Sequence, residues 1–317
     1  MELTARIPVG ISACMLGLKV RHDKGHKHAR YCTETLAQYF DFKSLCPEMG
    51  AGLPAPRKAM HLAQMGGQTR LITTDGLRDH TALMDDFIQR TLPSLASLRG
   101  FVLMAKSPSC GMERVKIYGD NGHVMSRDGV GQFADALMSA YPAMPVEESG
   151  RLNDPHLREN FVERVYVYDD WCSNVAPTLT AKALIAFHSR HKFQLLAHCQ
   201  ATYRNLGPLL ADLSTVPVEE VADTYIVAFM TAMKKVVSRG AHVNTLQHLA
   251  GFLKDQLDDI DHQILHEQIA AYQREDVPLI VPMTLLRGGL RKVPKPYVSQ
   301  QGYLAPYPDQ LGLRNAL

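Results

Sequence analysis

The stretch VGISAC, residues 9–14, is a short apolar run that ends in a cysteine, and it is typical of a buried strand of an α/β sheet. Two further runs have the same character, FKSLC at 42–46 and FVLMA at 101–105. Ligands of open α/β sheets bind at the carboxyl ends of the strands, so thiols that are distant in sequence meet there. The sequence therefore predicts one shared site for Cys14, Cys46 and Cys110, with Cys110 following the third run.

The rest of the chain divides into two patterns. From residue 7 to about 140, short apolar runs alternate with amphipathic segments, which is the rhythm of βαβ units. A turn-rich stretch follows at 141–155, and beyond Leu179 apolar residues recur at helical spacing. These patterns predict an α/β N-terminal domain with a mainly parallel sheet over 1–155, a connector over 156–179, and an all-α C-terminal domain over 180–317.

Composition limits the possible functions. The 317 residues are 46% hydrophobic and 21% charged, which is typical of a globular protein of about two domains. A net charge of +2 does not by itself indicate a nucleic-acid binder, so local clusters of charge must decide. The first residues lack a secretory pattern, and no apolar run approaches the roughly 20 residues that cross a bilayer. We therefore expect a cytoplasmic protein that does not interact with membranes.

The six cysteines are then packing residues, metal ligands or redox groups rather than disulfides. Cys32, Cys172 and Cys199 lie in helix-like or connecting segments, and we interpret them as packing residues. Three thiolates around one point suit zinc or an iron-sulfur cluster. A four-iron cubane held by three cysteines leaves one iron open, whereas a catalytic zinc would hold a water molecule. Spacing does not distinguish these two metals.

Other groups of residues are less specific. The basic loop KVRHDKGHKHAR at 19–30 favours contact with phosphate, although a solvated surface loop explains it equally well. His188, His191 and His198 fall on a predicted helix without an acidic partner of matching spacing. We interpret these three histidines as core or surface residues.

Three motifs together carry a family resemblance: VGISACMLG at 9–17 with VRHD at 20–23, LCPE at 45–48, and KSPSCG at 106–111. On these motifs the chain resembles the thiouracil desulfidase family. In the second half, FHSRHK at 187–192, YRNLG at 203–207 and YLAPYP at 303–308 resemble a helical domain of unknown function that is fused to some members. The fused form is similar to bacterial tRNA 4-thiouridine desulfidases.

The resemblance implies a 4Fe-4S cluster that is bound by Cys14, Cys46 and Cys110, with one iron not ligated by protein. It also implies a serine and a glutamate beside that iron, which we place at Ser107 and Glu48, with Ser109 as the alternative hydroxyl. The chain departs from the family at His22 and Lys24, where we expect an aromatic residue and a glycine.

The reaction implied by the resemblance is conversion of 4-thiouridine in tRNA to uridine, with release of sulfide and no net transfer of electrons. The residues expected to contact RNA are Arg21, Lys24, Arg190, Lys192, Arg291 and Lys292. One alternative is a desulfidase of free thiouracil or thiouridine. Another is a non-catalytic iron-sulfur or zinc sensor, or an RNA-binding protein.

Overall fold

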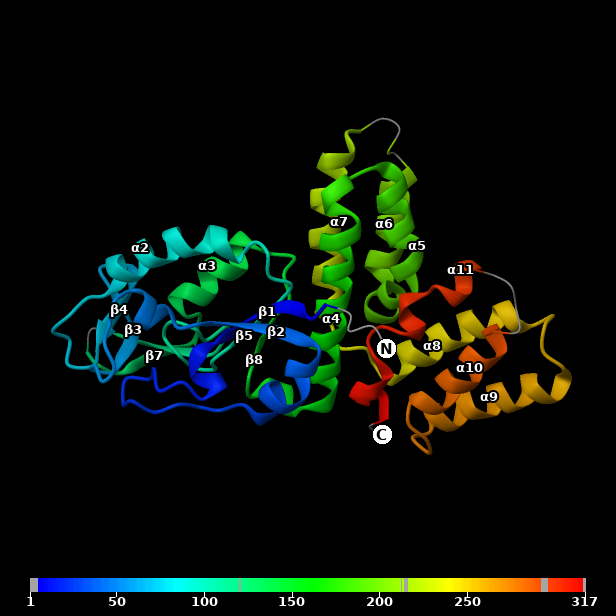
Figure 1. Ribbon diagram of the computed structural model, residues 1–317, viewed down its shortest axis with the longest axis horizontal. Helices are drawn as coiled ribbons and strands as arrows, with labels where there is room; N and C mark the ends of the chain where they lie inside the picture. Colours follow the sequence, from blue (N-terminus) through cyan, green and yellow to red (C-terminus); the bar gives the residue numbers. More distant parts are fainter. Residues whose placement is uncertain (1–4, 120, 212, 214–215, 292–295, 316–317) are drawn as a thin grey trace. The chain divides into compact units, whose positions relative to one another are not determined.

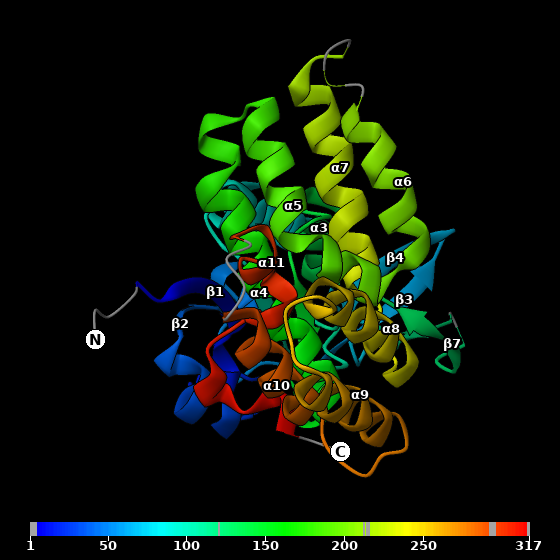
Figure 2. The same ribbon diagram turned by 90° about the vertical axis from the view of Figure 1, so that its right-hand side faces the viewer.

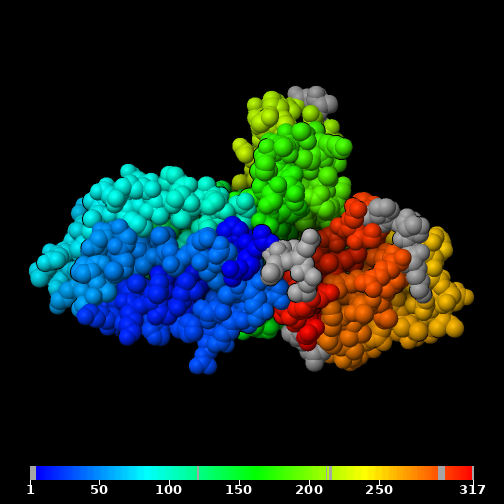
Figure 3. All heavy atoms as spheres, viewed as in Figure 1, coloured from blue at the N-terminus to red at the C-terminus, as the bar shows by residue number. Residues whose placement is uncertain are grey.

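The chain forms two compact units in the computed structural model, Met1–Asn153 and Asp154–Leu317. The structure describes residues 5–119, 121–211, 213, 216–291 and 296–315, and the remaining residues are grey in Figures 1 and 3. The first unit is α/β and the second is helical, so the predicted fold class is confirmed.

Sheet A of the first unit is fully parallel. It contains β1 (Ile7–Ser12), β2 (Phe40–Leu45), β5 (Phe101–Leu103) and β8 (Val146–Glu148), in the order β2-β1-β5-β8. Because the chain leaves β1 toward β2 on one side and β5 lies on the other, the direction of winding changes between β1 and β5. A change of this kind opens a crevice at the carboxyl ends of the strands.

Sheet B has the order β4-β3-β6-β7. Its strands are β3 (Met60–Met65), β4 (Gln68–Thr73), β6 (Val115–Tyr118) and β7 (Val124–Gly129). β3 pairs with β4 and β6 with β7 as antiparallel hairpins, whereas β3 and β6 are parallel. The helices of this unit are α1 (Pro47–Gly50), α2 (Thr81–Thr91) and α3 (Gln132–Ala140). α2 and α3 pack against each other along one side of the strands (Figure 1).

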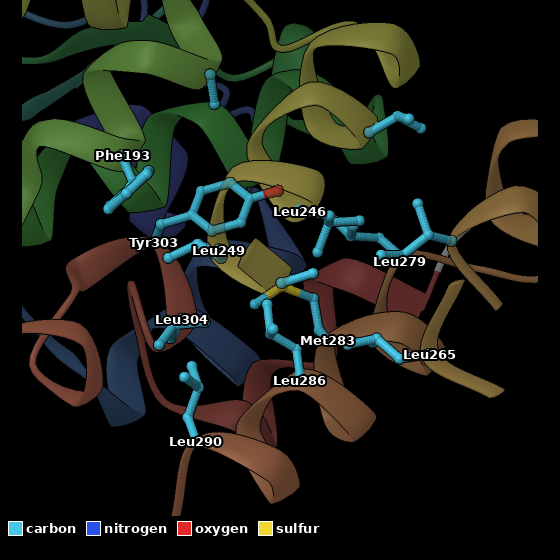
Figure 4. Close-up of a cluster of buried hydrophobic side chains, with 14 of the residues drawn as sticks. Phe193, Leu246, Leu249, Leu265, Leu279, Met283, Leu286, Leu290, Tyr303 and Leu304 are labelled. Atoms are coloured by element: carbon cyan, nitrogen blue, oxygen red, sulfur yellow. The ribbon is translucent and has the colours of Figure 1, made fainter. Parts of the chain in front are cut away.

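The second unit begins with α4 (Pro155–Asn174), α5 (Ala181–His198), α6 (Gln200–Ala211) and α7 (Val218–Met233). It continues with α8 (Arg239–Ala250), α9 (Asp259–Gln273), α10 (Ile280–Arg291) and α11 (Pro296–Ser299). α5, α6 and α7 lie side by side (Figure 2). A separate apolar cluster joins α8, α9 and α10 around Leu246, Met283 and Leu286, which are fully buried (Figure 4).

The connector expected over 156–179 is for the most part helix α4. Asp154 caps this helix by accepting hydrogen bonds from the backbone of His156 and Leu157, and Pro155 stands at its first position, as is common at helix starts. Polar residues such as Asn160 and Glu163 are buried in α4 beside Phe161. Because both kinds of residue are buried, the helix lacks the alternation of apolar and polar faces that would identify it in the sequence.

No helix in the described part of the chain is long and apolar enough to cross a membrane.

Candidate active site

The three predicted cysteines follow three strands of sheet A. Cys14 lies in the short helical turn Ala13–Leu16 directly after β1, and Cys46 stands between β2 and α1. Cys110 lies in the loop after β5. All three line one cavity of about 620 Å³, so the structure brings them together at the crevice of sheet A.

The loop that carries Cys110 is held by the start of α3. The backbone N–H groups of Gln132 and Phe133 donate to the carbonyls of Pro108 and Ser109, both at 3.0 Å. Gly131 lies so close that a Cβ atom there would come within 2.8 Å of the backbone of Ser109 and Cys110. This position therefore requires glycine, and the contacts fix the thiol of Cys110 at the cavity.

Burial dominates the electrostatics of the thiols. It raises the pKa of Cys14 to about 11, with a further contribution from the nearby Cys46. Burial also raises the pKa of Cys46 and, to a greater extent, that of Cys110, where Glu48, Cys46 and Cys14 add to the effect. Since the thiolate forms repel one another, they need a positive centre among them to be stable together.

Glu48 lies at the cavity in the first turn of α1. Its Oε1 accepts a hydrogen bond of 3.0 Å from the hydroxyl of Ser109. Its Oε2 accepts a bond of 2.9 Å from Nε of Arg57, and Nη2 of Arg57 binds the same oxygen. The carboxylate is thus held from both sides.

Arg57 is a functional candidate that the sequence analysis missed. Its guanidinium also donates to the carbonyls of Val20 at 3.1 Å and Pro54 at 3.0 Å. A single arginine nine positions after Glu48 matches no recurring motif, so only the fold reveals that it orients this carboxylate.

The two serines occupy different positions. Ser107 lines the cavity, and its Oγ accepts hydrogen bonds from the backbone N–H of Ser109 at 3.2 Å and of Cys110 at 3.1 Å. Ser109 is fully buried and supports Glu48. The geometry therefore presents Ser107 to the cavity and places Ser109 behind the carboxylate.

The predicted RNA-contacting residues are dispersed. Arg21 lines the cavity, and Lys24 is exposed in the same loop with φ +59°, the region that glycine favours. A glycine, as the resemblance led us to expect at position 24, would adopt this conformation without strain. In the helical unit, Arg190 binds Asp170 at 2.8 Å, and Nζ of Lys192 lies 4.6 Å from the ring centre of Tyr297. Arg291 is exposed at the end of α10, and Lys292 lies outside the described residues.

Each of the three histidines on α5 forms a hydrogen bond with another side chain of the helical unit, which is consistent with a structural role. His188 bonds the hydroxyl of Tyr225 at 3.0 Å, His191 bonds Asp170 at 2.6 Å, and His198 bonds Glu163 at 3.3 Å. Among the residues that the structure describes, no three histidine, cysteine or acidic side chains are close enough to hold a single metal ion.

Comparisons with known proteins match both halves of the chain. The family model for 2-thiouracil desulfurase matches residues 9–149, and a model described as a protein of unknown function (DUF1722) matches 192–308. The uncharacterized protein YbgA of Escherichia coli (strain K12) is 30% identical over 139 residues, which are 44% of this chain and 82% of YbgA. The chain belongs to the YbgA-like family. It joins a 2-thiouracil desulfurase family domain to a DUF1722 region.

One solved structure is also similar in sequence. It is the [4Fe-4S]-dependent thiouracil desulfidase TudS, which is 29% identical, with coverage of 48% of this chain and 95% of TudS and a TM-score of 0.37. The part of the chain that matches the 2-thiouracil desulfurase model, residues 9–149, contains all three cysteines of the cavity.

Proposed function

We propose that this protein is an iron-sulfur-dependent desulfidase that converts 4-thiouridine in tRNA to uridine and releases sulfide. The observation that carries the proposal is the convergence of Cys14, Cys46 and Cys110 on one cavity with Glu48 and Ser107, inside the domain that matches the desulfurase family. The reaction replaces a thiocarbonyl sulfur by the oxygen of water. It consumes one water, forms one hydrogen sulfide and moves no net electrons.

The donor set fits a 4Fe-4S cluster. Each cysteine of such a cluster binds a different iron, so the ligands surround a volume larger than one ion, as the three thiols surround this cavity. The cations Arg21 and Arg57 also line the cavity and offset the negative charge of bound thiolates. When bound, such a cluster would supply an iron not ligated by protein, a Lewis acid with affinity for the thiocarbonyl sulfur.

Glu48 is the candidate for proton transfer. Arg57 and Ser109 each hold one oxygen of its carboxylate and so fix its orientation. Lone pairs remain on the carboxylate that can accept further hydrogen bonds or a proton. A carboxylate held in this way can take a proton from the attacking water and return it to the departing sulfur.

Ser107 is suited to donate a hydrogen bond. Its Oγ already accepts two backbone N–H groups, so the capacity that remains to it is mainly that of the O–H donor. A hydroxyl donor stabilises negative charge that develops on the oxygen added to the ring carbon. The geometry favours this role over that of a nucleophile.

Folded RNA must be unstacked for a base to reach a recessed cavity, and this requires contacts to phosphates and neighbouring bases. The helical unit is our candidate for part of this binding, through Arg291 and the cations Arg190 and Lys192. Because Arg190 is bonded to Asp170, we expect its contribution to be smaller than that of the exposed Arg291. A tRNA substrate is consistent with the expected cytoplasmic location.

The test is anaerobic reconstitution with iron and sulfide, followed by incubation with tRNA that contains 4-thiouridine. We expect loss of the near-ultraviolet absorbance of the base, release of sulfide, and about four irons per chain, the number in one cubane. Glu48→Gln and Ser107→Ala should each lower turnover about 100-fold while the iron content stays unchanged. Ser109→Ala is the matched serine control and should reduce turnover less, because it acts only through Glu48.

Other outcomes favour the alternatives. Turnover of free 2-thiouracil or 4-thiouridine without turnover of thiolated tRNA would identify a desulfidase of free bases or nucleosides. Bound zinc in place of iron, or a bound cluster with no sulfide release from either kind of substrate, would contradict the proposal and favour a sensor.

A further inference from the structure

A second cavity, of about 600 Å³, lies beside the first one in the α/β unit. The two cavities share Met60, Lys106 and Pro108 in their walls. Two strands of sheet B supply most of the rest of the wall, β6 through Val115, Lys116 and Tyr118 and β7 through Arg127 and Asp128. A molecule bound in the first cavity can therefore continue into the second along Lys106.

The wall of the second cavity is strongly basic. Its charged residues are Lys106, Arg114, Lys116, Arg127 and Asp128. Arg114 is paired with Glu113 at 2.7 Å, and Asp128 accepts a bond from Ser126 at 3.2 Å. Within the described part of the chain, Lys106, Lys116 and Arg127 form no ion pair, and all three are exposed. Three free cations around one hollow favour a ligand with more than one negative charge.

The same wall contains an aromatic pair. The rings of His61 and Tyr118 have centroids 4.5 Å apart with an interplanar angle of 49°, and both residues are partly exposed. Burial lowers the pKa of His61, which favours the neutral ring. Flat, partly exposed rings next to free cations are the combination that binds single-stranded nucleic acid, because bases stack on the rings while phosphates contact the cations.

We infer that this second cavity binds the nucleotide next to the thiolated one. The neighbouring base stacks on the pair His61 and Tyr118. Lys106 contacts the phosphate between the two nucleotides, since it lies in both walls, and Lys116 and Arg127 contact the next phosphates. The inference rests on the proposed function for the identity of the reacting base, but binding to this surface can be measured without any reaction.

The experiment is fluorescence anisotropy with a labelled single-stranded oligouridylate of five residues and the full-length protein. Lys116→Gln/Arg127→Gln should raise the Kd about tenfold. It should also reduce the magnitude of the slope of log association constant against log salt concentration by about 1.4, because each of the two lost phosphate contacts on a single strand contributes about 0.7. Tyr118→Leu should raise the Kd about tenfold without changing that slope, because it removes stacking and no charge. The matched control Lys43→Gln/Arg90→Gln removes two exposed cations of the same unit that line neither cavity, and it should leave the Kd within twofold.

Catalysis gives a second readout. For the reconstituted protein, the ratio of kcat/KM for a thiolated pentanucleotide to that for free 4-thiouridine should fall about tenfold in Lys116→Gln/Arg127→Gln and stay unchanged in the control. A Kd that rises equally in the cavity variants and the control would overturn the inference. The inference would also be overturned if polyglutamate bound as tightly as the oligouridylate and if Tyr118→Leu left this binding unchanged. That result would show a surface that binds anions in general. If the binding results hold but no substrate releases sulfide, the proposed function fails and the nucleic-acid site stands.

Discussion

The two units each bury reactive or charged side chains, but they combine them in opposite ways. In the α/β unit, three thiols gather at one cavity, and burial raises the pKa of each one. In the helical unit, polar and charged side chains pair directly: the buried Glu163 and His198 are hydrogen-bonded, and the half-buried Glu159 accepts from the buried Arg314 at 2.9 Å. Raised pKa values keep the three thiols neutral at neutral pH, and an added cation would be needed to stabilise them together as thiolates, whereas the side chains paired in the helical unit satisfy one another within the chain. Buried polarity alone therefore does not identify a site.

The largest effect should come from the cysteines of the cavity. Cys110→Ala should abolish both cluster binding and sulfide release, because one of three ligands is lost. Iron analysis, visible absorbance and sulfide release measure these losses. Cys32→Ala is the matched control, since Cys32 is equally buried but lies outside the cavity, and it should retain the cluster. If Cys110→Ala retained the cluster, the three cavity thiols would not form the ligand set, and the contrast between the α/β unit and the helical unit would be wrong.

The next largest effect concerns the ion pair between Arg314 and Glu159 in the helical unit. Arg314→Met should lower the free energy of unfolding of the helical unit by about 3 kcal/mol, because it removes the buried guanidinium and leaves the half-buried carboxylate of Glu159 with only the hydroxyl of Tyr307. Urea unfolding followed by the fluorescence of Trp171 measures this unit specifically, because Trp171 is the only tryptophan of the sequence. The control Arg274→Met removes an exposed ion pair with Asp276 and should change the stability by less than about 0.5 kcal/mol.

Acid should weaken the same network. Burial alone would raise the pKa of Glu163, but the charge and hydrogen bond of His198 outweigh it and lower the pKa to about 2. A lowered folded-state pKa gives stability that is complete above the ordinary value near 4.5 and is lost as the pH falls toward 2, at a cost of about 3 kcal/mol. Urea midpoints from Trp171 fluorescence between pH 6 and pH 2.5 should fall, and Glu163→Gln should flatten this dependence. An equally steep decline in Glu163→Gln would assign the acid sensitivity to other carboxyl groups.

The smallest effect concerns Cys199, which belongs neither to the three thiols of the cavity nor to the paired side chains of the helical unit. Hydrogen bonds from Thr202 and Lys235 lower the pKa of Cys199 to about 7, in contrast to the raised values at the cavity. Iodoacetamide at pH 7 should therefore alkylate Cys199 first, and Lys235→Met should slow this several-fold by raising the pKa. Peptide mass spectrometry locates the label. Earlier labelling of the buried Cys32 would contradict the assignment.

Much of the fold was predictable from local patterns. Short apolar runs with βαβ rhythm predicted the parallel strands of sheet A, and the helical spacing of Leu184, Phe187 and Leu195 predicted α5. Helix α4 was not predictable in this way, because it buries polar residues beside apolar ones and so lacks a clear stripe. Its buried Glu163 is satisfied by Gln194 and His198, partners at least 31 positions away that no local pattern reveals.

The sequence by itself determined the fold class and the gathering of Cys14, Cys46 and Cys110, because strand ends of a parallel sheet meet at one edge whatever their separation along the chain. Only the tertiary structure decided how Glu48 is held and which serine faces the cavity. Those outcomes depend on long-range contacts, such as the bond from Arg57 to Glu48 and that from Ser109 to Glu48 across 61 positions. The second cavity is likewise a product of tertiary structure, since its cations come from separate segments that sheet B and the loop after β5 bring together.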